Sequence, residues 1–129
     1  LATADTLVNR RDYHGATMRF GHESCLLPLA GLLELGNCGK SYSLDELDTE
    51  WRCYNYFPMA SNIQLIFYRE KATKKNPNPT GEILVKALLN EKEVTLPAQT
   101  ENYPYYKWSD LSKYYAEKLA YYRAQLIHK

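Results

Sequence analysis

Apolar residues recur at helical spacing in the first third of the chain. Leu26, Leu29, Leu32 and Leu33 lie three and four residues apart, which is the period of one face of an α-helix. The pattern predicts a helix over residues 25–35. Pro28 has no amide N–H and is expected in the first turn, so the helix should begin close behind His22 and Glu23. Gly36 and Asn37 are expected to end it.

Other segments show the alternation of apolar and polar residues that is typical of strands, or contain β-branched and aromatic residues. They predict strands at residues 16–20, 62–68 and 83–89, and Gly21 is expected to end the first of them. A turn at residues 90–92 is expected to lead into a short hairpin partner at residues 94–96. The sequence therefore predicts a small number of strands distributed along the chain.

Two further helices are expected downstream. Ser43, with Glu46 three residues later, is typical of a capped helix start and predicts a short helix at residues 44–50. Residues 109–128 form a long amphipathic pattern, with Ser109 as the expected N-cap. The apolar stripe of this helix is expected to pack against the sheet and consists of Leu111, Tyr115, Leu119, Tyr122 and Leu126.

Residues 71–81 contain Pro77 and Pro79 and predict an exposed loop. Its lysines Lys71, Lys74 and Lys75, and Lys86 beyond it, are expected to be solvated. The order of elements predicts an α/β fold, a small mixed sheet flanked by helices. Residues 1–15 are interpreted as the tail of an element whose earlier part is absent, and residues 16–129 as one α/β core.

The composition narrows the functional classes. The chain has 129 residues and a formal net charge of +1, so its overall charge favours neither nucleic acid nor an anionic membrane as a partner. The longest apolar stretch, residues 26–35, is too short to span a bilayer, and no signal peptide is visible. Because the first residue is Leu1, the natural N-terminus is expected to lie upstream.

The cysteines and tyrosines are expected to have structural rather than catalytic roles. Cys25, Cys38 and Cys53 fit no zinc-ligand spacing, so thiols are expected, although a Cys38–Cys53 disulfide is compatible with an oxidising compartment. The chain has twelve tyrosines, many near its C-terminus. Amphipathic packing explains them best, and a carbohydrate- or base-stacking surface is the alternative.

One segment carries candidate chemistry. His22 and Glu23 follow the expected strand at residues 16–20 and precede the expected helix. Ligands of open α/β sheets bind at the carboxyl ends of strands, and helix N-termini present free N–H groups to anions. A phosphate is therefore a suitable ligand here. The alternatives are a non-catalytic binding module and a metal hydrolase using His22, Glu23 and Cys25, which is disfavoured because adjacent residues rarely point at one metal.

The stretch RFGHESCLLPLAGLLEL at residues 19–35 resembles the proton-donor region of the multiple inositol polyphosphate phosphatases, in branch 2 of the histidine acid phosphatases. Residues 59–62 and 88–92 are also similar to that family. The resemblance implies the C-terminal part of a phosphoglycerate-mutase-like α/β domain, no cofactor or metal, and a secreted or periplasmic enzyme. It implies hydrolysis of an inositol phosphate or another phosphomonoester through a phosphohistidine.

The family has His-Ala-Glu where this chain has His22, Glu23 and Ser24, and related phytases have His-Asp. The resemblance therefore assigns phosphate binding to His22 and proton donation to Glu23. The family's nucleophile lies in an upstream Arg-His-Gly motif that this chain lacks. His14 precedes Gly15, but Tyr13 replaces the arginine, so His14 is interpreted as a turn or surface residue. The missing N-terminal part of the same protein is therefore the expected partner.

Overall fold

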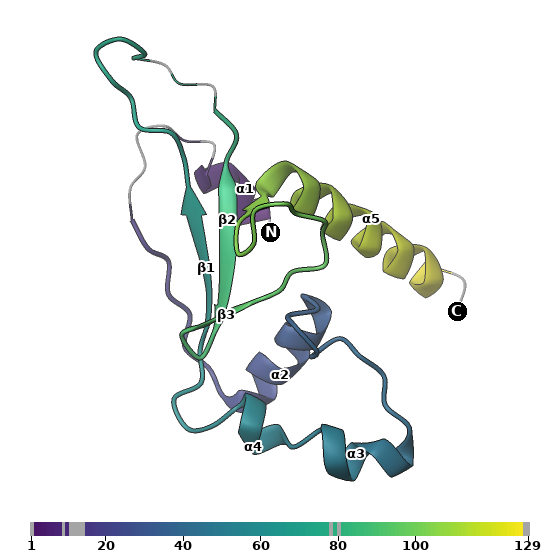
Figure 1. The fold of residues 1–129 in the computed structure, drawn as a ribbon. Coiled ribbons are helices and arrows are strands. Elements are labelled where there is room, and N and C mark those ends of the chain that lie inside the picture. Colours follow the sequence, from purple (N-terminus) through teal and green to yellow (C-terminus); the bar gives the residue numbers. More distant parts are fainter. Residues whose placement is uncertain (1, 9, 11–14, 78, 80, 128–129) are drawn as a thin grey trace. The chain divides into compact units, whose positions relative to one another are not determined.

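The computed structural model describes residues 2–8, 10, 15–77, 79 and 81–127. Over these residues the protein has a small α/β fold with a four-stranded sheet and helices (Figure 1). The sheet is antiparallel and not the mixed sheet that the sequence predicted. In chain order the elements are α1 (Ala2–Val8), α2 (Glu23–Leu32), α3 (Leu44–Glu50), α4 (Cys53–Tyr56), β1 (Ile63–Tyr68), β2 (Leu84–Leu89), β3 (Lys92–Val94), β4 (Tyr106–Lys107) and α5 (Trp108–Ile127). Of the turn expected at residues 14 and 15, residue 14 lies outside the described residues.

Strand β2 is the centre of the sheet, with β1 as one neighbour and both β3 and β4 as the others. It pairs antiparallel with β3 in the register Ala87 to Val94, and antiparallel with β4 in the register Val85 to Tyr106. Strand β1 also runs opposite to β2, because the N–H of Asn90, beyond the end of β2, donates to the carbonyl of Asn62, before the start of β1. The strands expected at residues 62–68 and 83–89 are confirmed.

The hairpin between β2 and β3 closes with two residues. Leu89 pairs with Lys92, which leaves Asn90 and Glu91 as the turn, with φ angles of 51° and 65°. Two successive left-handed residues define a type I′ turn, whose twist matches that of the flanking strands. Pairing therefore resumes at Lys92, and the expected partner strand at residues 94–96 is wrong by two residues.

The chain divides into two compact units. We call residues 1–17, 67–85 and 98–129 the terminal unit, and residues 18–66 and 86–97 the central unit. The division passes through β1 and β2, and each unit has buried apolar side chains of its own. Those of the central unit are Ala30, Leu33, Leu35, Phe57, Ala87 and Leu96, and those of the terminal unit are Val85, Tyr106, Trp108, Leu111 and Tyr115.

Helix α2 begins two residues before the predicted start at residue 25 and ends three residues before the predicted end at residue 35. Glu34 has a φ of 54°, its N–H donates to the Gly31 carbonyl, and the N–H of Leu35 donates to the Ala30 carbonyl. These two bonds form a Schellman motif, and Leu35, which follows Glu34, is fully buried. The helix therefore stops before Gly36 is reached, and Gly36 and Asn37 are not its terminators.

Pro28 is not in the first turn, which corrects a second expectation. The His22 carbonyl accepts hydrogen bonds from the N–H groups of Cys25 and Leu26, at 2.9 and 3.3 Å, so the helix starts at Glu23. Pro28 then lies inside α2. Its missing N–H leaves the Ser24 carbonyl without the usual helical donor.

The strand expected at residues 16–20 does not form. Residues 15–22 have no helix or strand assignment, and all of them are exposed, Phe20 to 95%. Alternation of apolar and polar residues favours an extended backbone, but a strand also needs a neighbour to pair with its N–H and C=O groups. Among the described residues, this segment has no such neighbour.

The short helix at residues 44–50 is confirmed as α3. The Glu46 carboxylate accepts hydrogen bonds from the backbone N–H and the hydroxyl of Ser43, at 3.0 and 2.8 Å. These bonds lower the pKa of Glu46 and satisfy the helix start as a capping box. The sequence did not predict α1, α4 or β4, which are short elements with little internal periodicity.

Helix α5 begins in the core of the terminal unit. Trp108 is buried, and its ring lies edge to face with that of Phe67, with the ring centroids 5.0 Å apart. The backbone N–H of Trp108 donates to the Ile83 carbonyl. Ser109 is not the N-cap, because the helix already includes Trp108 and the Ser109 hydroxyl donates to the Glu82 carboxylate at 2.6 Å. A long helix at this place is confirmed, with the start one residue earlier.

The apolar stripe of α5 is only half covered. Leu111 and Tyr115 are buried, whereas Leu119, Tyr122 and Leu126 are exposed. The expectation that the whole stripe packs on the sheet is therefore wrong. The buried part of the stripe ends at Tyr115, and the helix continues beyond it with its apolar side chains exposed.

The expected loop at residues 71–81 is confirmed at its described positions, which form no helix or strand and are mostly exposed. Lys86 is not a solvated residue of this group. Its ammonium group lies 3.1 Å from the Glu93 carboxylate across the β2–β3 hairpin. None of the described helices is long and apolar enough to cross a membrane.

Candidate functional site

His22 and Glu23 lie at the N-terminus of α2, as the sequence predicts. His22 is the N-cap residue, with an extended backbone (φ −97°, ψ 165°), and its side chain makes no capping hydrogen bond. Glu23 is the first residue of the helix. Both residues are exposed, as are Gly21 and Ser24 on either side. The imidazole and the carboxyl group are therefore accessible to a ligand from solution.

The local backbone can hold an anion. Glu23 and Ser24 are the first two residues of α2, and the N–H groups at a helix start have no acceptor within the helix. Together with the helix dipole they favour a negatively charged group near His22. An imidazole can donate a hydrogen bond to a phosphate oxygen, and a carboxyl group can transfer a proton. The described segment thus combines an anion-binding backbone with two groups capable of acid catalysis.

The structure does not provide the strand end that was expected to frame these residues. Because residues 16–20 form no strand, His22 and Glu23 follow an exposed extended segment rather than the carboxyl end of a sheet strand. What brings the two residues together is their adjacency in the sequence and the start of α2.

The cysteines do not extend this group into a metal site. Cys25 is exposed and is the third residue of α2, while Cys38 is half-buried and Cys53 exposed, and all three are free thiols. Burial raises the pKa of the Cys38 thiol. Across the described residues, no three His, Cys, Asp or Glu side chains form a group that could hold a metal ion. The arrangement that a metal hydrolase at His22, Glu23 and Cys25 would need is therefore not present there.

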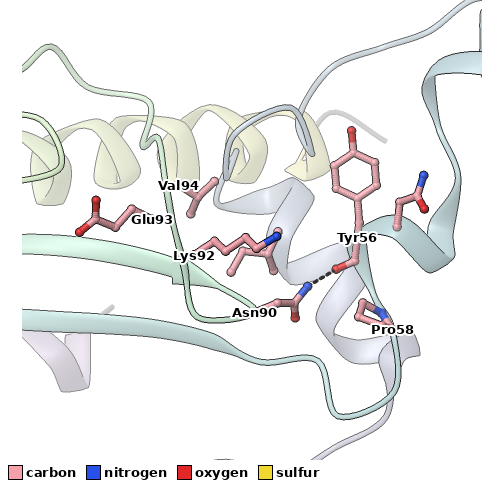
Figure 2. Close-up of a pocket in the computed structure, with 8 residues that line it drawn as sticks. Tyr56, Pro58, Asn90, Lys92, Glu93 and Val94 are labelled. Carbon is pink, nitrogen blue, oxygen red and sulfur yellow. Dashed lines mark hydrogen bonds between the residues drawn. The ribbon is translucent and has the colours of Figure 1, made fainter.

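The central unit also contains an open pocket that the sequence did not predict. It has a volume of about 300 Å³ and lies between the β2–β3 hairpin and the segment that follows α4 (Figure 2). Its lining residues are Asn55, Tyr56, Pro58, Leu89, Asn90, Lys92, Glu93 and Val94. His22 and Glu23 are not among them, so this pocket is separate from the candidate catalytic pair.

The side chain of Asn90 connects the hairpin to the other segment that lines this pocket. Its side-chain amide donates to the Tyr56 carbonyl at 2.7 Å, as Figure 2 shows, and its side-chain oxygen accepts from the Asn62 N–H at 3.1 Å. Asparagine tolerates the left-handed backbone of the turn, which leaves its carboxamide free for these long-range bonds. An asparagine between two predicted strands was the available signal, but it did not reveal the two distant partners.

An aromatic cluster borders the same pocket. The rings of Trp51 and Tyr56 are stacked, with centroids 4.4 Å apart, and Tyr42 lies 6.2 Å from Trp51. Desolvation and the neighbouring Tyr56 raise the pKa of Tyr42. The cluster therefore consists of two tyrosines and one tryptophan whose rings contact one another, and all three residues are half-buried.

No protein-family model matches the chain, and no curated protein matches it.

Proposed function

We propose that this chain is the C-terminal part of a histidine acid phosphatase that hydrolyses inositol polyphosphates. In this proposal His22 binds the transferring phosphate and Glu23 protonates the departing inositol oxygen. The observation that carries the proposal is the sequence of residues 19–35, which resembles the donor region of that family. Its His-Glu pair is exposed at the first turn of α2, as a substrate-contacting pair must be.

The reaction explains why both residues are needed. A nucleophilic histidine from the missing N-terminal part attacks the phosphorus, and the bond to the inositol oxygen breaks. An alkoxide is a poor leaving group, so a proton from Glu23 accelerates its departure. The same carboxylate then accepts a proton from the water that hydrolyses the phosphohistidine. His22 and the free N–H groups of α2 favour the charged phosphoryl group throughout.

The substrate itself assists the proton donor. A bound inositol polyphosphate brings dense negative charge next to Glu23, and neighbouring negative charge favours the protonated form of a carboxyl group. Because Glu23 directly follows His22, where the family has alanine, the donor carboxyl reaches a different position from that of His-Ala-Glu enzymes. We therefore expect a preference for phosphate positions on the inositol ring that differs from theirs.

The test compares two variants of the full-length parent on two substrates. Glu23→Gln should reduce the turnover of phytate by roughly 10²–10⁴-fold, the range for losing a general acid or base. It should affect an aryl phosphate much less, because that leaving group departs without a proton. His22→Ala should reduce both activities, since both substrates need phosphate binding.

Glu50→Gln is the matched control, because Glu50 is an exposed carboxylate in α3 and should leave both activities unchanged. Ser24→Ala addresses the position at which the family has glutamate. If Glu23→Gln harms both substrates equally, or neither, then Glu23 is not the donor.

A further inference from the structure

The open pocket of the central unit has a charged lining group that no described residue neutralises. Two of its lining residues are charged, Lys92 and Glu93. The Glu93 carboxylate lies 3.1 Å from the Lys86 ammonium group, so its charge is already paired. The Lys92 side chain forms no ion pair or hydrogen bond with the part of the chain that the structure describes, and its neighbour Glu91 does not line the pocket. The pocket therefore keeps a single positive charge.

The alternation of side chains along β3 directs this charge into the pocket. Successive side chains of a strand point to opposite faces, so Lys92 and Val94 share one face and Glu93 lies on the other. Lys92 is also the cross-strand partner of Leu89, which lines the same pocket. Figure 2 shows the Lys92 side chain extended toward the segment of Tyr56 and Glu93 directed away from it.

The remaining lining residues offer an apolar surface and one further polar group. Pro58, Leu89 and Val94 contribute hydrocarbon to the walls. The Asn55 carboxamide forms no side-chain hydrogen bond with any described residue, and it can donate or accept one. A ligand that matches these groups has a compact apolar body and a single anionic group.

Hydrogen bonds between distant residues hold the walls in place. The Asn90 side chain bonds to Tyr56 and Asn62, and the Asn90 N–H donates to the Asn62 carbonyl at 2.9 Å. Beyond the end of β3, the Gly36 N–H donates to the Thr95 carbonyl at 2.9 Å. Walls that are fixed before binding do not have to be ordered by the ligand. The volume of about 300 Å³ is at the lower end of the range for small-molecule sites.

We propose that this pocket binds a small organic monocarboxylate. Its carboxylate lies at the Lys92 ammonium group, and its hydrocarbon part lies on Pro58, Leu89 and Val94. One positive charge matches one carboxylate, whereas a phosphate monoester carries close to two negative charges at neutral pH. The catalytic pair proposed above does not line the pocket, so this site does not depend on the proposed phosphatase activity.

The probes are benzoate, benzamide, acetate and phenyl phosphate, each titrated into the isotope-labelled 129-residue chain and followed by nitrogen–proton correlation spectra. Benzoate should shift the amide resonances of Asn55, Asn90 and Val94, with a Kd of about 0.1–10 mM. Benzamide has the same shape without the charge and should bind roughly two- to fivefold more weakly, the range for a partly exposed ion pair. Acetate has the charge without the ring and should bind about tenfold more weakly, because it buries little apolar surface.

Substitutions of Lys92 locate the carboxylate. Lys92→Gln should weaken the binding of benzoate to the level of benzamide and leave the binding of benzamide unchanged, while Lys92→Arg should retain the preference for benzoate. Lys75→Gln is the matched control, because Lys75 is an exposed lysine of the terminal unit and its replacement should change neither affinity. Resonances distant from the pocket show whether each variant is folded.

Several results would overturn the proposal. They are equal binding of benzoate and benzamide, equal binding of benzoate and acetate, and a preference for benzoate that Lys92→Gln leaves unchanged. The absence of any shift at a lining residue in about 50 mM benzoate would also contradict it. Tighter binding of phenyl phosphate than of benzoate would assign the pocket to phosphate esters instead.

Discussion

Glu91 occupies a backbone conformation that suits glycine. Its φ of 65° follows the φ of 51° at Asn90, and together they close the β2–β3 hairpin. Asparagine adopts the left-handed region readily, but for glutamate it costs roughly 1–2 kcal/mol. Glycine has no such cost, although it gains more freedom in the unfolded chain. Glu91→Gly should therefore raise the free energy of unfolding by about 0.5–1 kcal/mol, measured by urea denaturation.

The control for this variant is Glu101→Gly. Glu101 is exposed, as Glu91 is, but its φ is not in the left-handed region. There the greater freedom of glycine in the unfolded chain has no compensation, so the change should be neutral or destabilising. If both variants lower the unfolding midpoint by the same amount, the turn does not strain Glu91.

At the level of elements, α5 has two energetically different halves. Leu111 is buried, and Leu111→Ala should lower the free energy of unfolding by about 2–5 kcal/mol because it leaves a cavity. Leu119 lies on the same stripe but is half exposed, so Leu119→Ala should cost less than about 1 kcal/mol. Chemical denaturation of the two variants measures the difference. Similar large losses would mean that the stripe is covered along its whole length.

The start of α5 should respond to acid through Glu82. Its carboxylate accepts a hydrogen bond from the Ser109 hydroxyl at 2.6 Å and pairs with the Lys107 ammonium group at 3.2 Å, and these contacts lower its pKa. A carboxyl group whose pKa is lowered by folding stabilises the protein above its unfolded pKa. That contribution disappears as the pH falls through the folded pKa.

We therefore expect Glu82→Gln to reduce the loss of stability that the protein shows between about pH 6 and about pH 3. Urea denaturation at a series of pH values measures this dependence. Glu117→Gln is the control, because Glu117 is an exposed carboxylate of α5 and its replacement should leave the pH dependence unchanged. An equal acid sensitivity of the wild type and Glu82→Gln would show that these contacts do not contribute.

The elements that the sequence predicted best are those with local determinants. Helix α3 depends on Ser43 and Glu46, which are three residues apart, and the start of α2 depends on the position of His22. The strand at residues 16–20 failed because alternation cannot supply a pairing neighbour. The stripe of α5 failed beyond Tyr115 because a period shows which face is apolar but not how far it is covered.

The same distinction applies to the sites. The accessible pair at His22 and Glu23 follows from adjacent residues at a helix start, and the sequence was sufficient to place it. The pocket depends on the Asn90 side chain, which donates a hydrogen bond to Tyr56 and accepts one from Asn62, residues that lie 34 and 28 positions away along the chain. No local pattern contains such a contact.

At the scale of the whole molecule, the candidate catalytic pair lies within one of the two compact units. His22 and Glu23 both belong to the central unit, residues 18–66 and 86–97.

The proposed reaction needs a nucleophilic histidine that this chain does not supply. Its three histidines are His14, His22 and His128, and none follows an arginine and precedes a glycine. His22 is assigned to phosphate binding, and His14 and His128 lie outside the described residues. Without a nucleophile no phosphohistidine forms, so a proton donor at Glu23 has no departing oxygen to protonate.

We therefore expect the purified 129-residue chain to release no phosphate from phytate above a buffer blank, measured by a colorimetric phosphate assay. The His22→Ala form of the same chain is the control, and any trace of activity from a contaminating phosphatase should be equal in the two preparations. Turnover that survives repurification and disappears in both His22→Ala and Glu23→Gln would show that the chain carries a complete active site. A nucleophile would then have to be sought among its own residues, beginning with His14, because Gly15 follows it as a glycine follows the family's nucleophile.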